Sequence, residues 1–334
     1  MKLLNSFKKK SSKVDKETFC SLALELFHYQ SRACAIYQKY LNYLGVDCIR
    51  INSIEQIPCL PIDFFKEHKI KTGDWEEEEV FMSSGTTASI RSQHYIEDSK
   101  FYLNNAKTIF EEFRGELNQH AFFALLPSYQ EQGHSSLVKM VDFFIHKSNQ
   151  GNMGGYYLNR LEELVDDLLR ALNQTSKSIV LFGVGYALLD LVEIAKKRGA
   201  RLDGLVIIET GGMKGRRKDL VKSEFYSILK IGLGSVRVFS EYGMTELLSQ
   251  AYSLNEKSYQ LPDQMKVLIR DIEDPFNYLK VGETGGVNVI DLANVHSCAF
   301  IETKDLGRLS NDREFEILGR LDNSDIRGCN LLVD

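Results

Sequence analysis

The chain is organised around the stretch Val80-Phe81-Met82-Ser83-Ser84-Gly85-Thr86-Thr87-Ala88. Its apolar start indicates a strand, and the hydroxyl side chains around Gly85 indicate a tight loop directly after it. Hydroxyl groups and free backbone N–H groups in such a loop can surround phosphate oxygens, and a glycine lets the backbone approach them closely. The alternative interpretation is an ordinary Ser/Thr turn at the surface. The loop is not the common nucleotide loop, because no Gly-Lys-Ser/Thr follows at the required spacing.

After this loop, short apolar runs alternate with helical patterns along the chain. The runs are rich in β-branched and aromatic residues, which is typical of buried strands. Alternation of such strands with helices predicts a parallel sheet that helices cover on both faces. Ligands of these sheets bind beyond the carboxyl ends of the strands. The runs predicted as strands are Ala121–Leu126, Ser178–Gly183, Leu205–Glu209 and Val236–Phe239.

The two ends of the chain have different patterns from this α/β region. Between Lys16 and Tyr43, apolar residues recur at three- and four-residue steps, as in amphipathic helices. From Gly285 onward, short strand-like runs are separated by turn residues, which predicts a small antiparallel β subdomain. We therefore predict an α/β body with N-terminal helices at 1–285, and a β subdomain with the C-terminal tail at 286–334.

Composition limits the class of protein. The 334 residues are 43% hydrophobic and 26% charged, as in ordinary globular proteins with a sizeable core. The net charge of −5 predicts no nucleic-acid binding. No apolar run reaches the roughly 18 residues that a membrane span needs. The start, Met1–Phe7, has too little apolar content for a secretory signal, so we expect a cytoplasmic protein.

The six cysteines predict no metal site. None of them forms a Cys-x-x-Cys pair, and no histidine pair stands at zinc-ligand spacing. Scattered cysteines in a chain of this length are mostly buried small hydrophobic residues of a reducing compartment. Cys329, close to the C-terminus, is a candidate for a different role.

Three further segments have residue types that suit a nucleotide. Gly211 and Gly212, at a strand end, would let a flat base lie on the backbone. In Tyr242-Gly243-Met244-Thr245-Glu246, the ring can stack on adenine, the threonine hydroxyl can bond a phosphate, and the carboxylate can hold Mg²⁺. Asp305 can accept both ribose hydroxyls, and Arg320 can anchor ribose or phosphate. Each segment alone is typical of a turn, but together with the hydroxyl loop they predict one nucleotide site.

The pair of Ser-Ser-Gly-Thr-Thr at 83–87 and Tyr-Gly-Met-Thr-Glu at 242–246 resembles the adenylate-forming superfamily of acyl-CoA synthetases and their relatives. The resemblance extends from about Pro58 to Asp334. It implies that a carboxylate attacks the α-phosphate of ATP and gives an acyl-adenylate and pyrophosphate. The implied roles are α-phosphate contact for Thr245, Mg²⁺ binding for Glu246, adenine stacking for Tyr242, and ribose binding for Asp305 with Arg320 beside it.

Within this superfamily, the chain is most similar to the LuxE-type acyl-protein synthetases. Ser240–Tyr252 and Leu126-Pro127-Ser128-Tyr129 are of that kind. The sequence also ends shortly after Arg320, where CoA ligases continue into a mobile lid domain that carries an assisting lysine. The resemblance implies an adenylate-forming N-terminal fold without that lid. It also implies that Cys329, in Gly-Cys-Asn-Leu-Leu, accepts the acyl group.

The chemistry that this likeness implies suits a thiol. A thiolate that attacks the mixed anhydride gives a thioester and releases AMP, and Arg320 or Arg327 could favour the thiolate. The implied substrate is a fatty acid, with a long chain, and the implied partner is an acyl-reductase or an acyltransferase that receives the acyl group. The alternative for Cys329 is that it packs with Leu331 and Leu332.

Two other functions are compatible with the same motifs. One is an acyl- or aryl-CoA ligase, of the phenylacetate-CoA ligase kind, that lacks its C-terminal domain. The other is a non-catalytic subunit that binds adenylate. His94, on a strand-like run after the hydroxyl loop, could face a phosphate, but a lone histidine on a strand is usually structural.

Overall fold

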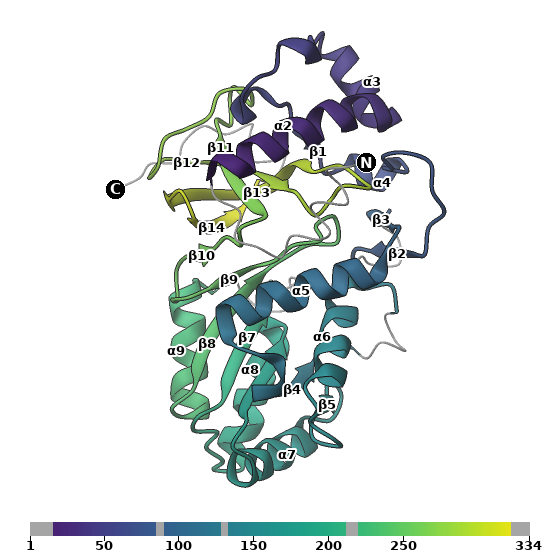
Figure 1. The fold of residues 1–334 in the computed structure, drawn as a ribbon. Helices are drawn as coiled ribbons and strands as arrows, with labels where there is room; N and C mark the ends of the chain where they lie inside the picture. Colours follow the sequence, from purple (N-terminus) through teal and green to yellow (C-terminus); the bar gives the residue numbers. More distant parts are fainter. Residues whose placement is uncertain (1–15, 85–89, 128–132, 212–219, 322–334) are drawn as a thin grey trace. The chain divides into compact units, whose positions relative to one another are not determined.

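The computed structural model describes residues 16–84, 90–127, 133–211 and 220–321 (Figure 1). The chain divides into two compact units. One unit is Glu77–Gln260, and the other joins Met1–Glu76 to Leu261–Asp334. This partition differs from the division at residue 285 that the sequence suggests. The N-terminal helices group with the C-terminal strands, and strand β12 (Thr284–Asp291) runs through position 285.

The Glu77–Gln260 unit is built on one large sheet. Its strand order is β10-β9-β8-β7-β6-β4-β5. The strands from β8 to β5 are parallel, and β9 and β10 are antiparallel to their neighbours. The bounds are β4 (His120–Leu125), β5 (Gly155–Tyr156), β6 (Ser178–Gly183), β7 (Val206–Thr210), β8 (Arg237–Tyr242), β9 (Ala251–Ser253) and β10 (Tyr259–Gln260). The predicted parallel α/β fold and its apolar strands are therefore confirmed.

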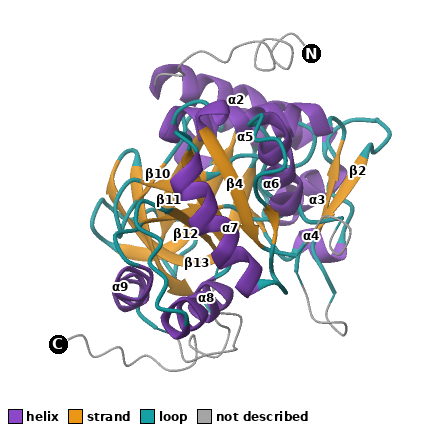
Figure 2. Cartoon of the chain, turned by 90° about the horizontal axis from the view of Figure 1, so that it is seen from below, coloured by secondary structure: helices purple, strands orange, loops and turns teal. Residues whose placement is uncertain are grey.

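Helices cover both faces of this sheet, as its continuous apolar strands require. Figure 2 shows α5 and α6 on one side of the strands, and α8 and α9 on the other. Two of the helices begin at a side-chain cap, since Asp98 accepts from the Phe101 N–H at 2.8 Å and Ser135 accepts from the Val138 N–H at 3.4 Å. The bounds are α5 (Ser99–Arg114), α6 (Ser136–Lys147), α7 (Leu161–Gln174), α8 (Gly185–Lys197) and α9 (Lys222–Leu233).

An aromatic cluster fills the space between α5, α6 and the sheet. Phe110 of α5 is its centre, with ring centroids at 5.0 to 6.4 Å from those of its four partners. All five side chains are fully buried. Burial of each contributes roughly 1.5–3 kcal/mol, and tilted or edge-on ring pairs add to this. The cluster consists of Phe110, Phe122, Phe144, Phe182 and Tyr252.

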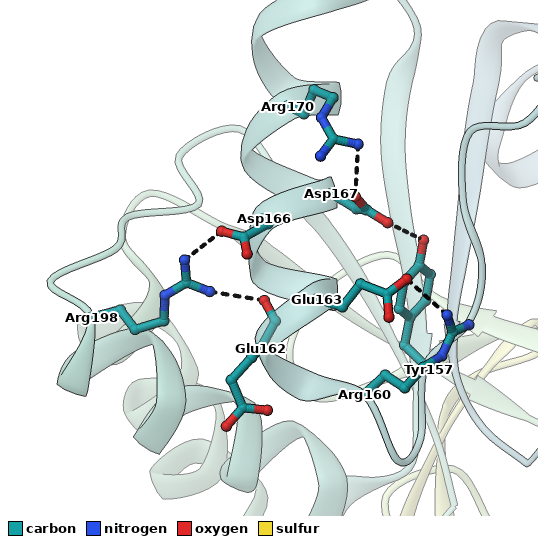
Figure 3. A network of polar contacts seen from close by, with 8 residues as sticks. All are labelled: Tyr157, Arg160, Glu162, Glu163, Asp166, Asp167, Arg170 and Arg198. Atoms are coloured by element: carbon teal, nitrogen blue, oxygen red, sulfur yellow. Dashed lines mark hydrogen bonds and ion pairs between the residues drawn. The ribbon is translucent and has the colours of Figure 1, made fainter.

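Polar contacts at the surface connect α7 to α8 (Figure 3). The Arg198 guanidinium, just after α8, donates to the Glu162 carbonyl at 2.8 Å and pairs with Asp166. At the far side of α7, Asp167 accepts from the Tyr157 hydroxyl at 2.7 Å and pairs with Arg170 at 2.9 Å. These groups are largely exposed, so they orient the helices more than they stabilise them.

The second unit has an antiparallel sheet, as the sequence predicts for the C-terminal strands. Its order is β11-β12-β13-β14, and β1 (Leu60–Pro61) adds to β13 in parallel. The N-terminal helices of the same unit agree with the predicted amphipathic segment. The remaining bounds are β11 (Met265–Arg270), β13 (Phe300–Asn311), β14 (Glu314–Arg320), α2 (Lys16–Ala33), α3 (Ala35–Tyr43) and α4 (Phe64–Glu67).

One buried amide ties the two sequence segments of this unit together. Gln30, on α2, donates through Nε2 to the Asn294 carbonyl at 2.8 Å, and its Oε1 accepts from the Ala299 N–H at 2.9 Å. The Gln30 side chain is fully buried, and these partners lie more than 260 positions away in the sequence. A buried backbone group that loses its partner destabilises a fold strongly. Gln30 therefore holds α2 against the segment between β12 and β13.

No helix within the described ranges has the length and apolar content needed to cross a membrane.

We expect Gln30→Leu to lower the free energy of unfolding by about 2–4 kcal/mol, because it leaves buried backbone groups without partners. Urea unfolding followed by circular dichroism measures this. Gln38→Leu is the matched control, because Gln38 is exposed on α3. Equal losses in the two variants would contradict the role of Gln30.

Candidate functional site

The parallel pairing of β7 with β8 brings two of the predicted segments together. Thr210, at the end of β7, lies in register with Glu241 of β8. Gly211 follows with a φ of +84°, a conformation that favours glycine. The motif at 242–246 leaves the neighbouring strand at the same edge. Gly212, the second glycine of the predicted base-binding loop, lies outside the described residues.

The shape of the motif depends on a carboxyl group that precedes it. A Cβ atom at Gly243 would lie 2.2 Å from Oε1 of Glu241, so a larger residue here would require the carboxyl end of the Glu241 side chain to shift. The Tyr242 ring is buried beside Tyr259, with centroids 5.7 Å apart. Met244 and Thr245 are half-buried, and the Glu246 side chain is buried.

The β2–β3 hairpin presents the hydroxyl loop. Strands β2 (Glu79–Met82) and β3 (Gln93–Ile96) are antiparallel. Ser83 closes the base of the loop, because its N–H donates to the Ser92 carbonyl at 3.1 Å and its Oγ accepts from the Ser92 N–H at 3.0 Å. Ser84 is exposed. The other predicted residues of this loop, Gly85, Thr86 and Thr87, lie outside the described residues.

His94 connects this hairpin to the motif. Its Nδ1 lies 2.8 Å from the Thr245 carbonyl oxygen, so Nδ1 carries the proton and donates. The ring is buried, and burial lowers the pKa of His94 to about 4. Of the two interpretations left open by the sequence, this geometry favours the structural one. Its partner Thr245 lies 151 positions away, so no local pattern in the sequence indicates this contact.

Helix α5 holds the segment that follows the motif. The Asn105 side chain donates to the Leu248 carbonyl at 2.9 Å and to the Ser249 hydroxyl at 3.2 Å. The motif is therefore anchored on both sides of Glu246, by His94 before it and Asn105 after it. Preorganised groups of this kind can stabilise developing charge without reorganising during a reaction.

Burial raises the pKa values of two carboxyl groups at the same strand ends. Burial raises the pKa of Glu241 to about 8, and the charge of Glu209 adds to this. Burial also raises the pKa of Glu209 to about 7, although a hydrogen bond from the Ser240 hydroxyl at 2.9 Å opposes the shift. Sequence analysis assigned neither group a role, because burial of a carboxyl is a property of the folded sheet.

Two buried polar atoms at this edge lack a hydrogen-bond partner within the described protein. They are Oγ1 of Thr210 and Oε1 of Gln250, and both side chains are only 4% exposed. Gln250 is next to the motif, since its Cγ would lie 3.4 Å from a Cβ at Gly243. Buried polar atoms are normally paired, so this edge has unmet capacity for a polar ligand.

The remaining predicted residues, Asp305 and Arg320, belong to the other unit and pair with each other. They are opposite in the β13–β14 register, and Arg320 Nε lies 3.8 Å from Asp305 Oδ1. The register shifts between Leu306 and Gly307, and a Cβ at Gly307 would lie 2.5 Å from the Glu316 carbonyl oxygen. This bulge explains the glycine that follows Asp305 by two positions. Cys329 lies outside the described residues.

The described part of the chain has no cluster of three or more histidine, cysteine or acidic side chains that could bind a metal by itself. Proteins usually hold Mg²⁺ through one or two carboxylates together with substrate phosphates. Glu246 is the carboxylate of the motif that can take this part.

Solved structures that share this fold are adenylate-forming ligases. 2-Hydroxyisobutyryl-CoA ligase, in an open conformation with 2-HIB-AMP and CoA, has a TM-score of 0.68 at 14% identity, over 92% of this chain and 70% of its own. ATP-bound MatB from Rhodopseudomonas palustris has a TM-score of 0.52 at 15% identity, over 72% of this chain and 47% of its own. The amide bond synthetase McbA from Marinactinospora thermotolerans has a TM-score of 0.50 at 18% identity, over 73% of this chain and 49% of its own.

These likenesses establish the α/β fold that the sequence predicts. The chain spans about half the length of MatB and of McbA. No protein-family model matches the chain, and no curated protein matches its sequence. The LuxE-type likeness therefore stays a prediction from the motifs.

We expect Glu241→Gln to change how stability depends on pH. The pKa of a glutamate in the unfolded chain is about 4.3, whereas the pKa of Glu241 in the folded protein is about 8. The wild type therefore loses stability as the pH rises from about 5 to 8, and the glutamine variant should lose less, by at least about 1 kcal/mol. Urea unfolding at a series of pH values measures this. The control is Glu224→Gln, at an exposed position on α9, whose stability should depend on pH as that of the wild type does. If the stability of Glu241→Gln also falls with pH as steeply as that of the wild type, the raised pKa of Glu241 is contradicted.

We expect His94→Leu to destabilise the protein at pH 7 by about 1–3 kcal/mol, because the Thr245 carbonyl loses its buried donor. The low pKa of folded His94 gives stability that is present above about pH 6.5 and is lost as the pH falls to about 4. The variant should lack this acid-dependent component. Thermal unfolding between pH 4 and 7 measures both effects, with the exposed His146→Leu as control. If His94→Leu loses as much stability as the wild type between pH 7 and 4, His94 is not the source of that loss.

Proposed function

We propose that this chain activates a carboxylic acid with ATP and Mg²⁺ and transfers the acyl group to its own Cys329. The observation that carries the proposal is the anchored edge of the sheet. Gly211 and the motif at 242–246 leave adjacent strands there, and His94 joins the motif to the hairpin that begins the hydroxyl loop. The adenylate-forming fold of the unit supports this interpretation.

In the first half-reaction, an oxygen of the substrate carboxylate attacks the α-phosphorus of ATP. A P–O bond forms, the bond to pyrophosphate breaks, and an acyl-adenylate results. We assign α-phosphate contact to Thr245, phosphate binding to the loop at 83–87, and the base to the Gly211–Gly212 segment and Tyr242. Asp305 and Arg320 would bind the ribose. The unpaired atoms of Thr210 and Gln250 are suitable partners for polar groups of this nucleotide.

Mg²⁺ fits the donor set at this edge. A single buried carboxylate, Glu246, stands next to the proposed phosphate contact at Thr245, and nucleotide phosphates supply the other ligands in such sites. The ion would neutralise charge that builds up on the phosphates during attack. The chain's own part is to hold Thr245 in place through the His94 hydrogen bond.

In the second half-reaction, the Cys329 thiolate attacks the carbonyl carbon of the acyl-adenylate. A C–S bond forms, the C–O bond to AMP breaks, and the thiol proton goes to solvent. Other cysteines are poorer acceptors, because burial raises the pKa of Cys34 and Cys298, and that of Cys59 to about 12. Cys20 and Cys48 are half-buried and serve as controls.

The acyl group that we propose is that of a long-chain fatty acid, and the proposed receiver is a partner acyl-reductase or acyltransferase. The motifs that resemble LuxE-type acyl-protein synthetases support this choice. A second candidate is transfer to CoA. It is favoured by one observation, the likeness to a ligase that was solved with an acyl-adenylate and CoA.

Intact-protein mass spectrometry after incubation with Mg-ATP and fatty acids of graded length tests the proposal. We expect a hydroxylamine-sensitive acyl adduct on the wild type and on Cys48→Ala, and none on Cys329→Ala. Glu246→Gln should form AMP about 100-fold more slowly, because charge stabilisation at the phosphates is lost.

The remaining outcomes discriminate between the alternatives. If AMP forms only when CoA is added, and no variant carries an acyl adduct, the acyl acceptor is CoA and not Cys329. Absence of AMP with every acid and acceptor offered would reject adenylation and favour a non-catalytic adenylate-binding subunit.

A further inference from the structure

A cavity of about 190 Å³ opens at the opposite edge of the same sheet. Its wall includes the first residue of four parallel strands, and the last turn of α5 completes it. Figure 1 shows α5 crossing the strands of this unit. The four first residues are His120 of β4, Ser178 of β6, Val206 of β7 and Arg237 of β8.

This cavity is separate from the candidate nucleotide site. The nucleotide motifs follow the carboxyl ends of β7 and β8, whereas the cavity lies at the amino ends of these strands. Phe110, Phe182 and Tyr252 of the aromatic cluster are fully buried between α5 and the middle of the sheet. A ligand in the cavity therefore cannot be part of the proposed adenylation site.

The charged groups of the cavity are all basic. Arg114 and Arg237 line it together with His120, and its lining contains no carboxylate. Arg237 is exposed, and no ion pair or side-chain hydrogen bond forms at its guanidinium within the described protein. Guanidinium groups without a carboxylate partner are suited to bind an anion from solution.

Arg114 is the more deeply placed cation. Its guanidinium stacks 3.6 Å from the centroid of the Phe239 ring and donates to the Ser253 carbonyl, but its buried Nε has no hydrogen-bond partner. Burial lowers the pKa of Arg114 to about 10, and the nearby charge of Arg237 acts in the same direction. A bound anion would supply both the missing acceptor and an opposite charge.

His120 has the second unmet atom. Its Nε2 donates to the Arg114 carbonyl at 2.9 Å, and its buried Nδ1 has no partner. The residue is only 7% exposed. Burial lowers the pKa of His120, and the nearby charges of Arg114 and Arg237 add to this. Because Nε2 carries the proton, Nδ1 of His120 is an acceptor, and the unpaired donor that an anion can satisfy is Nε of Arg114.

The floor of the cavity is apolar. Phe113, Val180, Ile208 and Phe239 contribute to it beside Phe110. Inorganic anions gain nothing from such a floor, whereas an organic anion would bury its apolar part there. A cavity of roughly 150 Å³ holds a benzene ring, so the present one has room for a ring or short alkyl group next to a carboxylate.

We propose that this cavity binds a small organic monocarboxylate of about the size of benzoate or hexanoate, with its carboxylate on Arg114 and Arg237 and its apolar part on the phenylalanine floor. The site goes beyond the proposed adenylation function and does not depend on it.

Titration of 4-fluorobenzoate into the full chain, followed by ¹⁹F NMR without ATP, tests this proposal. We expect Arg237→Gln to weaken binding at least tenfold, and Ser178→Phe, which adds a bulky ring to the cavity lining without removing charge, to abolish it. Arg201→Gln is the control, because Arg201 is an exposed arginine that pairs with Asp203 before β7. Glu246→Gln reports on binding at the proposed adenylation site instead. Circular dichroism confirms that each variant is folded.

The proposed site is supported if Arg237→Gln and Ser178→Phe lose binding while Arg201→Gln and Glu246→Gln keep it. Binding that survives in both cavity variants, or that is lost only in Glu246→Gln, would overturn it. Displacement of fluorobenzoate by inorganic phosphate at equal concentration would also overturn it, because the apolar floor would then have no part in recognition.

Discussion

The parallel pairing of β7 with β8 is the constraint on which the candidate site depends. Parallel neighbours end at the same edge of a sheet, so segments that are 30 residues apart in the chain, Gly211 and the motif after Glu241, must emerge side by side. The register places Thr210 beside Glu241. The Glu241 carboxyl then occupies the space that a side chain at position 243 would need. Sheet geometry and motif composition are thus coupled.

Side chains from other elements fix the motif in this position. His94 comes from the β2–β3 hairpin and binds a backbone carbonyl, whereas Asn105 comes from α5 and binds both a backbone carbonyl and the Ser249 hydroxyl. Backbone acceptors are present whatever the residue, so the two carbonyl contacts hold the path of the loop without restricting its sequence. The side chains of Thr245 and Glu246 belong to the segment that these contacts hold in place.

The two ends of the parallel strands, which form the carboxyl edge and the amino edge of the sheet, differ in which buried polar atoms have no hydrogen-bond partner among the described residues. At the carboxyl edge, two carboxyl groups have raised pKa values, and oxygen atoms of Thr210 and Gln250 have no hydrogen-bond partner among the described residues. At the amino edge, the unpaired atoms belong to Arg114 and His120, beside a guanidinium that is open to solvent. The aromatic cluster separates the edges and supplies the rigid packing that keeps both sets of groups buried.

The sequence by itself determined the fold class. Strands buried on both faces must be apolar along their whole length, and that pattern is local, so β4, β6, β7 and β8 could be found from it. The linear motifs predicted one nucleotide site, and of their segments the structure brings Gly211 and the motif at 242–246 to neighbouring strand ends. The partners of Gln30 and His94, and the proton that Glu241 keeps, were decided only by the tertiary structure. The hydrogen bonds of Gln30 and His94 depend on groups that are distant in the sequence, and the raised pKa of Glu241 depends on burial. Long-range contacts and the burial of one carboxyl group leave no periodic pattern in the chain.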